Sequence, residues 1–399
     1  MNKNLPELNV GVVGHIDHGK TTLLSKLTGK FTDTHSEELK RGITIKLGYA
    51  ETTIYKCGNV FSNKEIKGEK CEPIRYVSFI DAPGHEMLMA IMLSGAAVID
   101  AAILVIAANE GIKPQTREHF MALQAKKIKN IIVVQNKIDL VDKKKAMESY
   151  KEIKDFLKGT IAEHSLIIPV SAHQEINLDK IFEALAAIEI PKRDTESVPF
   201  FIIARSFDIN RPGTKIQDLR GGVLGGILKK GTLKIGDEIE IKPGINTKKH
   251  NETIYKTLSS KILSLHRGNE SVKEVTPGAS ISIETSLDPF LTKADSLTGC
   301  VVSLKNKLPE VKYRIKLEAS LFKEVFGLKS EKEVEQFKTK ELLMLSINTT
   351  ITVGFVEKIS KNEVELSLNI PIVALEGDNA GIARNIEGHW RLIGWGRII

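Results

Sequence analysis

The sequence predicts an α/β domain with a mostly parallel sheet and a phosphate-binding loop (P-loop), followed by two β-barrel domains. A glycine-rich motif at 14–21 stands between a strand-like and a helix-like run. Strand-like and helix-like runs alternate to about Ile190, and short alternating runs fill the chain from about 199 to its end. We expect domains at 1–195, 196–308 and 309–399, because 399 residues suffice for two or three domains.

The glycine-rich motif, Gly14–Thr21, reads GHIDHGKT and matches the G-x-x-x-x-G-K-[ST] loop. The apolar run Val10–Val13 predicts a strand before it, and Thr22–Leu27 predicts a helix after it. In that setting the backbone N–H groups and the helix N-terminus attract phosphates. Lys20 adds a full positive charge, and the Thr21 hydroxyl can bind Mg²⁺. A chance glycine-rich turn is the alternative, but the Lys-Thr pair and the flanking strand and helix favour the phosphate-binding loop.

Further strands and helices extend this domain. Apolar runs predict strands at 76–80, 101–108, 130–135 and 166–170, and helical spacing is seen at 118–127 and 179–188. The alternation predicts a parallel sheet with helices on both faces. Ligands of such sheets bind at the carboxyl ends of the strands, so residues there are candidate site residues.

The segment after the 76–80 strand contains Asp81 and His85. Asp81 can hold Mg²⁺ through a water molecule, and the N–H of Gly84 can contact a γ-phosphate. His85 is placed to orient an attacking water. A plain surface histidine is the alternative, but the position next to Gly84 favours the catalytic role.

The next strand ends in Asn136–Asp139, which indicates a guanine site. The Asp139 carboxylate can accept hydrogen bonds from the N1–H and N2–H₂ groups of guanine, a donor pair that adenine lacks. Asn136 and Lys137 would support the base and cover its face. In Ser171–His173, which ends the following strand, the N–H of Ala172 can meet guanine O6.

A switch segment is expected around Thr44, between the first two motifs. Its hydroxyl can bind Mg²⁺ when the γ-phosphate is present, which would make the segment an order–disorder switch. The residues therefore predict a GTP-binding switch with hydrolytic capacity.

Composition narrows the class of protein only slightly. The net charge of +7 suits a polyanionic partner, although lysine-rich surfaces also serve solubility. No secretory or membrane-spanning segment is visible, and the three cysteines predict no disulfide framework. We expect a protein of the reducing cytoplasm.

A family resemblance rests on these motifs and on four further segments. Gly14–Thr22, Arg41–Thr44, Asp81–His85 and Asn136–Asp139 resemble the translational GTPases of the elongation factor Tu type. Thr32–Ile45, Leu47–Ala50, Thr285–Pro289 and Trp390–Gly396 resemble the gamma-subunit family of archaeal and eukaryotic translation initiation factor 2. The resemblance spans nearly the whole chain, and the length favours the archaeal form.

The resemblance implies roles for individual residues. His85 would orient the water, and Ile16 with Ile43 would form an apolar gate beside it. The nucleotide would contact Asp17, His18, Gly19, Lys20, Thr21, Thr22, Gly84, Asn136, Lys137, Asp139, Ser171, Ala172 and His173. The metal residues would be Thr21, Thr44 and Asp81 (through water) for one Mg²⁺, and Asp17 with the Gly42 carbonyl for a second.

The family also implies a zinc knuckle of two Cys-x-x-Cys pairs between the switches. Here the pairs read Cys57-x-x-Val60 and Cys71-x-x-Ile74. Structural zinc needs four ligands, so we expect no zinc, with Cys57 and Cys71 as remnants in a lysine-rich loop.

The function implied is GTP-dependent delivery of initiator methionyl-tRNA to the small ribosomal subunit. GTP hydrolysis to GDP would switch the tRNA release. The chain would form the core of a heterotrimer, with the alpha subunit on the second domain and the beta subunit on the first. Alternatives are an elongation-type carrier (general or selenocysteine-specific), the GTPase of sulfate activation, and a scaffold whose hydrolysis is incidental. Trp390 and Trp395 fit barrel packing better than an RNA surface, so the tRNA function rests on the family.

Overall fold

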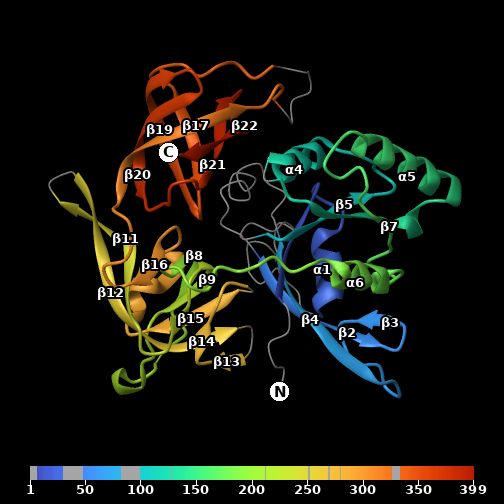
Figure 1. Cartoon of the computed structure of the whole chain (residues 1–399), viewed down its shortest axis with the longest axis horizontal. Coiled ribbons are helices and arrows are strands. Elements are labelled where there is room, and N and C mark those ends of the chain that lie inside the picture. Colours follow the sequence, from blue (N-terminus) through green and yellow to red (C-terminus); the bar gives the residue numbers. More distant parts are fainter. Residues whose placement is uncertain are drawn as a thin grey trace. The chain divides into compact units, whose positions relative to one another are not determined.

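The computed structural model describes residues 7–29, 48–81, 99–125, 127–211, 213–249, 252–267, 270–278, 280–325 and 333–399. The chain forms two compact units, which we describe separately (Figure 1). Of the described residues, one unit comprises those up to 81, those from 99 to 191, and 324, 325 and 333, and the other comprises those from 192 to 323 and from 334 to 399. The domain boundaries at 195 and 308 stay a prediction.

The first unit is built on a seven-stranded sheet in the order β3-β2-β4-β1-β5-β6-β7. Strands β4, β1, β5, β6 and β7 run parallel to their neighbours, whereas the hairpin β2–β3 joins antiparallel at the edge beside β4. The bounds are β1 (Glu7–Gly14), β2 (Gly48–Cys57), β3 (Val60–Ser62), β4 (Cys71–Asp81), β5 (Ala101–Ala107), β6 (Asn130–Asn136) and β7 (Ile167–Pro169). The predicted mostly parallel sheet is confirmed.

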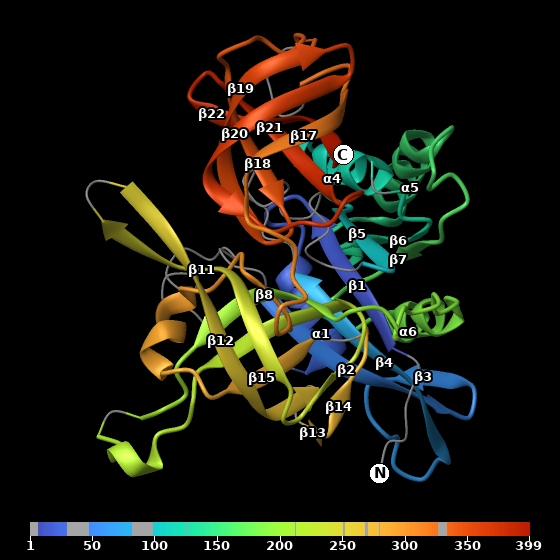
Figure 2. The ribbon, with the colours of Figure 1, turned by 60° about the vertical axis from the view of Figure 1, so that its left-hand side comes forward.

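Helices cover both faces of this sheet, as the alternation predicts. Helices α1 (Lys20–Thr28) and α6 (Leu178–Ala187) lie on one face, and α4 (Pro114–Ala125) and α5 (Lys143–Leu157) on the other (Figures 1 and 2). The α1 side chains Leu23, Leu24 and Leu27 are buried in one cluster with apolar residues of the central strands and of α6. A single continuous core therefore fixes α1 on the sheet.

The start of one helix differs from the prediction, and the start of another is capped by a side chain. The helix predicted at 118–127 is α4, which begins at Pro114. The prediction missed this start because the first turn is polar and shows no apolar periodicity. Helix α5 begins at Lys143, where Asp142 caps it by accepting a hydrogen bond from the Lys145 N–H at 2.7 Å.

The expectation that the cysteines form no disulfide is wrong. Cys57 and Cys71 are joined by a disulfide bond. They stand directly opposite each other in the antiparallel β2–β4 ladder, a register that a count of cysteines does not reveal. Cys300 is free and buried in the second unit.

The second unit contains two closed barrels, so the predicted barrel architecture is confirmed. The first barrel runs β11-β16-β8-β9-β15-β12 and closes through the β11–β12 pairing, and the second runs β17-β20-β19-β18-β21-β22. The first consists of β8 (Phe200–Phe207), β9 (Val223–Lys230), β11 (Glu238–Lys249), β12 (Glu252–Arg267), β15 (Ile281–Thr285) and β16 (Val301–Leu304), with the short β10 (Leu233–Lys234), β13 (Glu270–Val272) and β14 (Glu274–Val275). The second consists of β17 (Lys312–Leu321), β18 (Leu342–Ile347), β19 (Thr350–Ser360), β20 (Glu363–Ile372), β21 (Asn379–Ile386) and β22 (His389–Ile398).

The barrels pack on each other within this unit. Phe200, Ile202 and Val301 of the first barrel form one buried cluster with Val373. The Thr349 hydroxyl donates a hydrogen bond to the Ile203 carbonyl at 2.7 Å across the same junction. Trp390 and Trp395 lie on β22 and are half-buried, so the choice between barrel packing and an RNA surface stays a prediction.

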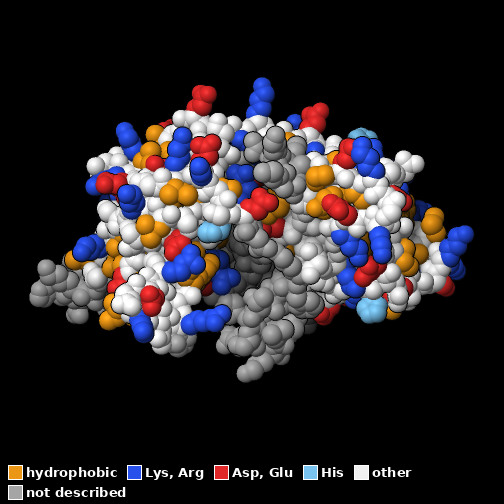
Figure 3. Space-filling model, turned by 90° about the horizontal axis from the view of Figure 1, so that it is seen from below, with side chains coloured by type: hydrophobic (Ala, Val, Ile, Leu, Met, Phe, Trp, Pro, Cys, Tyr) orange, Lys and Arg blue, Asp and Glu red, His pale blue; other side chains and the backbone are white. Residues whose placement is uncertain are grey.

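The charged side chains are mixed on the face shown in Figure 3, where Lys and Arg are interspersed with Asp and Glu. The net positive charge therefore forms no uniform patch among the described residues of that face. Within the described residues, none of the helices combines the length and the apolar character that crossing a bilayer requires.

Candidate nucleotide-binding site

The P-loop connects the end of β1 to the start of α1. Gly14 has φ 143° and Gly19 has φ 85°, conformations that side chains disfavour. A Cβ at Gly14 would lie 2.3 Å from the Val105 carbonyl oxygen, and one at Gly19 would lie 2.5 Å from Asn136 Nδ2. Both glycines are therefore required by the loop and its neighbours.

Lys20 is the first residue of α1 and is only 8% exposed. Its Nζ donates a hydrogen bond to the His15 carbonyl at 2.8 Å, which keeps the ammonium inside the loop. Thr21 and Thr22 follow in the first turn of α1, Thr21 being half-buried and Thr22 exposed. The P-loop thus presents a lysine, a hydroxyl and a helix N-terminus together.

The end of β4 lies beside this loop, because Asp81 pairs with Val12 in the parallel β1–β4 ladder. The backbone of Asp81 is thus near the P-loop, as its predicted metal role requires. The side chain of Asp81 and the residues Gly42, Ile43, Thr44, Gly84 and His85 lie outside the described part of the chain, so their roles stay predictions.

The residues present fit a Mg²⁺ ion held with nucleotide phosphates. The described residues contain no cluster of three or more His, Cys, Asp or Glu side chains that could hold a metal alone. Mg²⁺ bound with phosphates needs only one or two protein ligands, and Thr21 at the start of α1 can supply one. Asp17, the predicted ligand of a second Mg²⁺, is exposed in the loop with φ 64°.

Asn136 ties three of the predicted motifs together. Its Nδ2 donates to the His18 carbonyl of the P-loop at 2.9 Å, and its Oδ1 accepts from the Ala172 N–H at 3.1 Å. Both groups are buried, so this side chain fixes the edge that we predict to bind the base relative to the P-loop. Ser171 shapes the same edge, because its hydroxyl accepts from the Gln174 N–H at 3.1 Å.

Asp139 lies in the short helix η1 (Ile138–Leu140) directly after β6, with its side chain exposed to solvent. Lys137 adopts φ 60°, and its Nζ lies 3.5 Å from Oε1 of Glu110. The sequence interpretation missed Glu110, which follows β5 and gives Lys137 a carboxylate partner. His173 is exposed near the same edge.

Helix α4 supplies two site residues that the sequence interpretation missed. The Gly14 N–H donates to Nδ1 of His119 at 2.8 Å, and the Ile16 N–H donates to Oε1 of Gln115 at 3.2 Å. Gln115 and His119 are four residues apart and so share one helix face. Polar residues at that spacing in a helix next to a P-loop are the signal that could have revealed them.

Burial keeps the histidines of this site neutral. It lowers the pKa of His119 to about 3 and that of His18 to about 4, and lowers the pKa of His15 as well. The neutral His119 ring can accept the Gly14 N–H at Nδ1, whereas a protonated ring has no acceptor left. The P-loop contact therefore depends on an uncharged His119.

Acidification is expected to destabilise the nucleotide domain through His119. Its pKa is about 3 in the folded chain against 6.5 when unperturbed, so between these values the unfolded chain binds the extra proton. The free energy of unfolding then falls by about 1.4 kcal/mol per pH unit below 6.5 from this residue. Urea unfolding at pH 7, 6 and 5 should show a shallower fall for His119→Gln, and equal slopes would contradict the assignment.

His119→Ala is expected to raise the GDP dissociation rate about tenfold, because the buried Gly14 N–H loses its acceptor. Stopped-flow release of a fluorescent GDP analogue measures this rate. Arg117→Ala is the matched control, since Arg117 is exposed on the same helix and its guanidinium lies over the Phe156 ring. Equal rates for the two variants would show that the Gly14 contact is immaterial.

Comparison with known proteins decides the family. The elongation factor Tu GTP binding domain family matches residues 6–191, and the family "Initiation factor eIF2 gamma, C terminal" matches residues 313–398. The translation initiation factor 2 subunit gamma of Thermoplasma acidophilum is 51% identical over 98% of this chain and 97% of its own length. The chain belongs to the gamma-subunit family of translation initiation factor 2. The subunit of Methanocaldococcus jannaschii is also 51% identical, with the same coverage.

Solved structures agree on the fold. The bacterial selenocysteine-specific elongation factor aligns with TM-score 0.74 and 23% identity, over 99% of this chain and 58% of that one. The elongation factor SelB of Methanococcus maripaludis, solved with the GTP analogue GPPNHP, aligns with TM-score 0.72 and 25% identity over 100% and 80%. The matching family models and the gamma-subunit relatives make the chain a translational GTPase, the GTPase subunit of its initiation factor.

Proposed function

We propose that this chain carries initiator methionyl-tRNA to the small ribosomal subunit in its GTP state, in the cytoplasm, and releases the tRNA after hydrolysis. The identity of 51% to gamma subunits over nearly the whole chain carries this proposal. The P-loop, the Asn136 network and the exposed Asp139 support the nucleotide part of it.

In this proposal the described residues bind and orient the nucleotide. The N–H groups of the P-loop and the Lys20 ammonium hold the phosphates, and Asp139 selects guanine over adenine. Asn136 and Ala172 fix the base-binding edge at a set position relative to the P-loop, so that one nucleotide contacts the edge with its base and the loop with its phosphates. A bound Mg²⁺ would neutralise charge between the outer phosphates, held by Thr21 and Thr44, with Asp81 acting through water.

The remaining predicted residues, of which Ile16 and Asp17 lie in the described P-loop and the others outside the described part, complete the proposal. His85 would hold the attacking water behind the gate of Ile16 and Ile43. Gly84 would sense the γ-phosphate. Asp17 and the Gly42 carbonyl would hold a second Mg²⁺.

His85→Ala is expected to preserve GTP affinity and to slow GTP hydrolysis by about 10²- to 10⁴-fold, the usual contribution of a positioned proton-transfer or water-orienting group. Phosphate release in single turnover, with filter-binding affinities measured in parallel, separates the two effects. His164→Ala is a matched control, because His164 is an exposed histidine of the same domain, in the turn before β7, and has no predicted nucleotide contact. Unchanged hydrolysis in His85→Ala would remove His85 from the mechanism and favour the scaffold alternative.

The alpha subunit is proposed to dock on the first barrel, and the beta subunit on the nucleotide domain. Ile216 in η2 (Ile216–Asp218) is 89% exposed and Phe290 in η3 (Pro289–Asp295) is 75% exposed, which suits a covered apolar contact. The Asn210 side chain makes two hydrogen bonds of 2.8 Å with the Arg220 backbone and so holds the segment that presents Ile216. In a pull-down, the Ile216→Ser variant should capture less alpha subunit than the wild type and the same amount of beta subunit. Unchanged capture of alpha would contradict the first assignment.

One tRNA experiment tests the function as a whole. Filter binding of the purified chain with GTP or GDP should show preference for initiator over elongator methionyl-tRNA, and only with GTP. Equal binding of both tRNAs would favour a general elongation-type carrier. Binding of selenocysteinyl-tRNA alone would favour the alternative suggested by the structural likeness to the selenocysteine elongation factors.

A further inference from the structure

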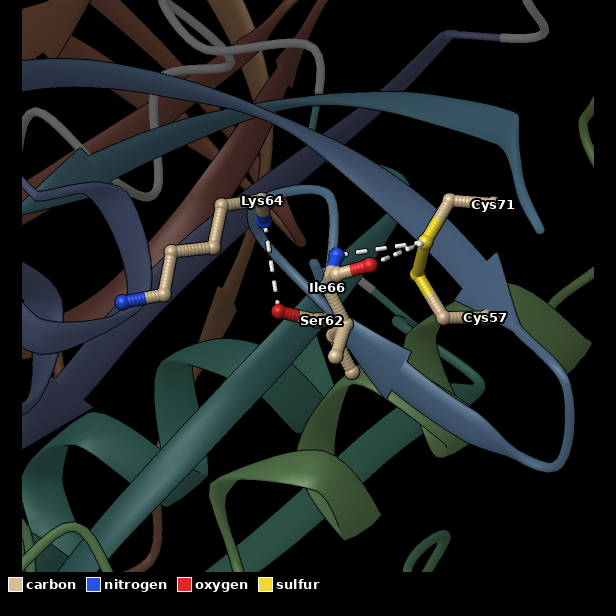
Figure 4. The surroundings of a disulfide bond; sticks show 5 residues. All are labelled: Cys57, Ser62, Lys64, Ile66 and Cys71. Atoms are coloured by element: carbon tan, nitrogen blue, oxygen red, sulfur yellow. Dashed lines mark hydrogen bonds between the residues drawn. A yellow bond between two sulfur atoms is a disulfide. The ribbon is translucent and has the colours of Figure 1, made fainter. Parts of the chain in front are cut away.

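The zinc knuckle that the family resemblance implies does not fit the residues of this chain. Val60 and Ile74 occupy two of the four positions where cysteines would stand, and neither side chain can bind a metal. The two remaining cysteines are joined to each other by a disulfide bond, which leaves no thiolate for a metal (Figure 4).

The disulfide closes a small loop at one edge of the sheet. Cys57 ends β2 and Cys71 begins β4, 14 residues apart, and the hairpin strand β3 lies between them. Cys57 is fully buried, and the Ile66 N–H donates a hydrogen bond to Sγ of Cys71 at 3.2 Å (Figure 4). We call residues 57–71 the knuckle.

The knuckle holds the end of the helix that begins in the P-loop. Nδ2 of Asn63 donates to the carbonyl oxygens of Lys26 and Leu27 at 3.2 and 3.1 Å, in the last turn of α1. Carbonyls in the last turn of a helix have no partners within the helix itself, so bonds of this kind stabilise its end. Phe61 packs against the same core that buries α1. The segment that the disulfide closes therefore braces the helix whose first residue is Lys20.

The strand that follows the disulfide braces a second helix. The guanidinium of Arg75, on β4, donates to the carbonyl oxygens of Leu185 and Ile188 at the end of α6. Helix α6 starts shortly after Ser171–His173 of the base-binding edge. The C-terminal end of α1 is thus hydrogen-bonded to the knuckle, and that of α6 to the strand that follows it.

We propose that the Cys57–Cys71 disulfide is a redox-sensitive cross-link that takes the place of the implied zinc. By holding the knuckle closed, it stabilises the helices that carry the nucleotide site, at the ends away from that site. A dithiol reductant would cleave it by thiol–disulfide exchange: the S–S bond breaks, the two cysteines gain two electrons and two protons, and the dithiol becomes a disulfide. Opening the knuckle would free Asn63 from α1 and speed nucleotide release. This second step rests on the proposed nucleotide function, whereas the cross-link itself does not.

The cross-link is tested by peptide mapping. Cells making the full chain are quenched with an alkylating reagent under denaturing conditions, and the protein is digested with trypsin without reduction. Peptides 57–64 and 71–75 should appear as one disulfide-linked species, with only Cys300 alkylated and with no stoichiometric zinc bound. Alkylation of all three cysteines, or one tightly bound zinc per chain, would overturn the proposal.

The coupling to the nucleotide site is tested by GDP release from the oxidised and the dithiol-treated chain. Reduction should speed dissociation about fivefold or more, the lower limit expected when two hydrogen bonds on α1 are lost. The double variant Cys57→Ala with Cys71→Ala should match the reduced chain and no longer respond to dithiol, whereas Cys300→Ser should respond like the wild type. Asn63→Ala should release GDP quickly in both states. A linked peptide with unchanged GDP release would leave the cross-link and overturn the coupling.

Discussion

Replacing Asp139 by asparagine is expected to weaken binding of guanine nucleotides by about 10³- to 10⁴-fold. The carboxylate of Asp139 is exposed at the end of β6, beside an edge that Asn136 ties to the P-loop. It can accept two hydrogen bonds from guanine, whereas an amide offers one acceptor and sets an N–H donor against a guanine donor. A xanthine base carries an oxygen in place of the 2-amino group, so the variant should bind xanthosine diphosphate more tightly than the wild type does.

Competition of GDP and xanthosine diphosphate for the fluorescent nucleotide measures this reversal. Asp142→Asn is the matched control, because Asp142 caps α5 only three residues further along and its amide can still cap. A variant that loses affinity for both nucleotides equally would have lost its fold rather than its selectivity. An Asp139→Asn chain that still prefers GDP would remove Asp139 from the guanine site.

Replacing Lys20 by alanine is expected to lower GTP and GDP affinity by about 10²- to 10³-fold, the range seen when one partner of a buried charge pair is truncated. Lys20 is nearly buried, and its Nζ is held on the His15 carbonyl inside the loop. An ammonium in that position supplies the only full charge that the described P-loop residues direct at the outer phosphates. GTP should suffer more than GDP, because the γ-phosphate adds charge.

Lys26→Ala is the control for this variant. Lys26 lies on the same helix, but it is exposed and pairs with Glu175 at 2.7 Å on the surface, where an ion pair contributes little. Titration calorimetry of both variants against GDP and GTP gives the comparison. Equal affinities of the Lys20 and Lys26 variants would show that the loop binds phosphate through its backbone alone.

Much of the fold and of the candidate site could be predicted from local patterns. The strand–loop–helix context of Gly14–Thr21 depends on residues adjacent in the chain, so periodicity and glycine spacing were sufficient. The same holds for the strand ends at Asp81, Asn136 and Ser171, since the carboxyl ends of parallel strands share one edge. The start of α4 at Pro114 was missed because a polar first turn leaves no apolar period to detect.

The sequence by itself indicated the chemistry of this protein: a P-loop, a strand end that we predict to select guanine, and a two-barrel extension, each formed by residues close together in the chain. Only the tertiary structure decided which distant groups hold that chemistry in place. The bond from Gly14 to His119 spans 105 residues, and the one from Asn136 to His18 spans 118. The joining of Cys57 to Cys71 likewise depends on strand register, because antiparallel pairing sets which side chains stand opposite each other. Such contacts follow from the packing of helices and strands, and spacing along the chain does not specify them.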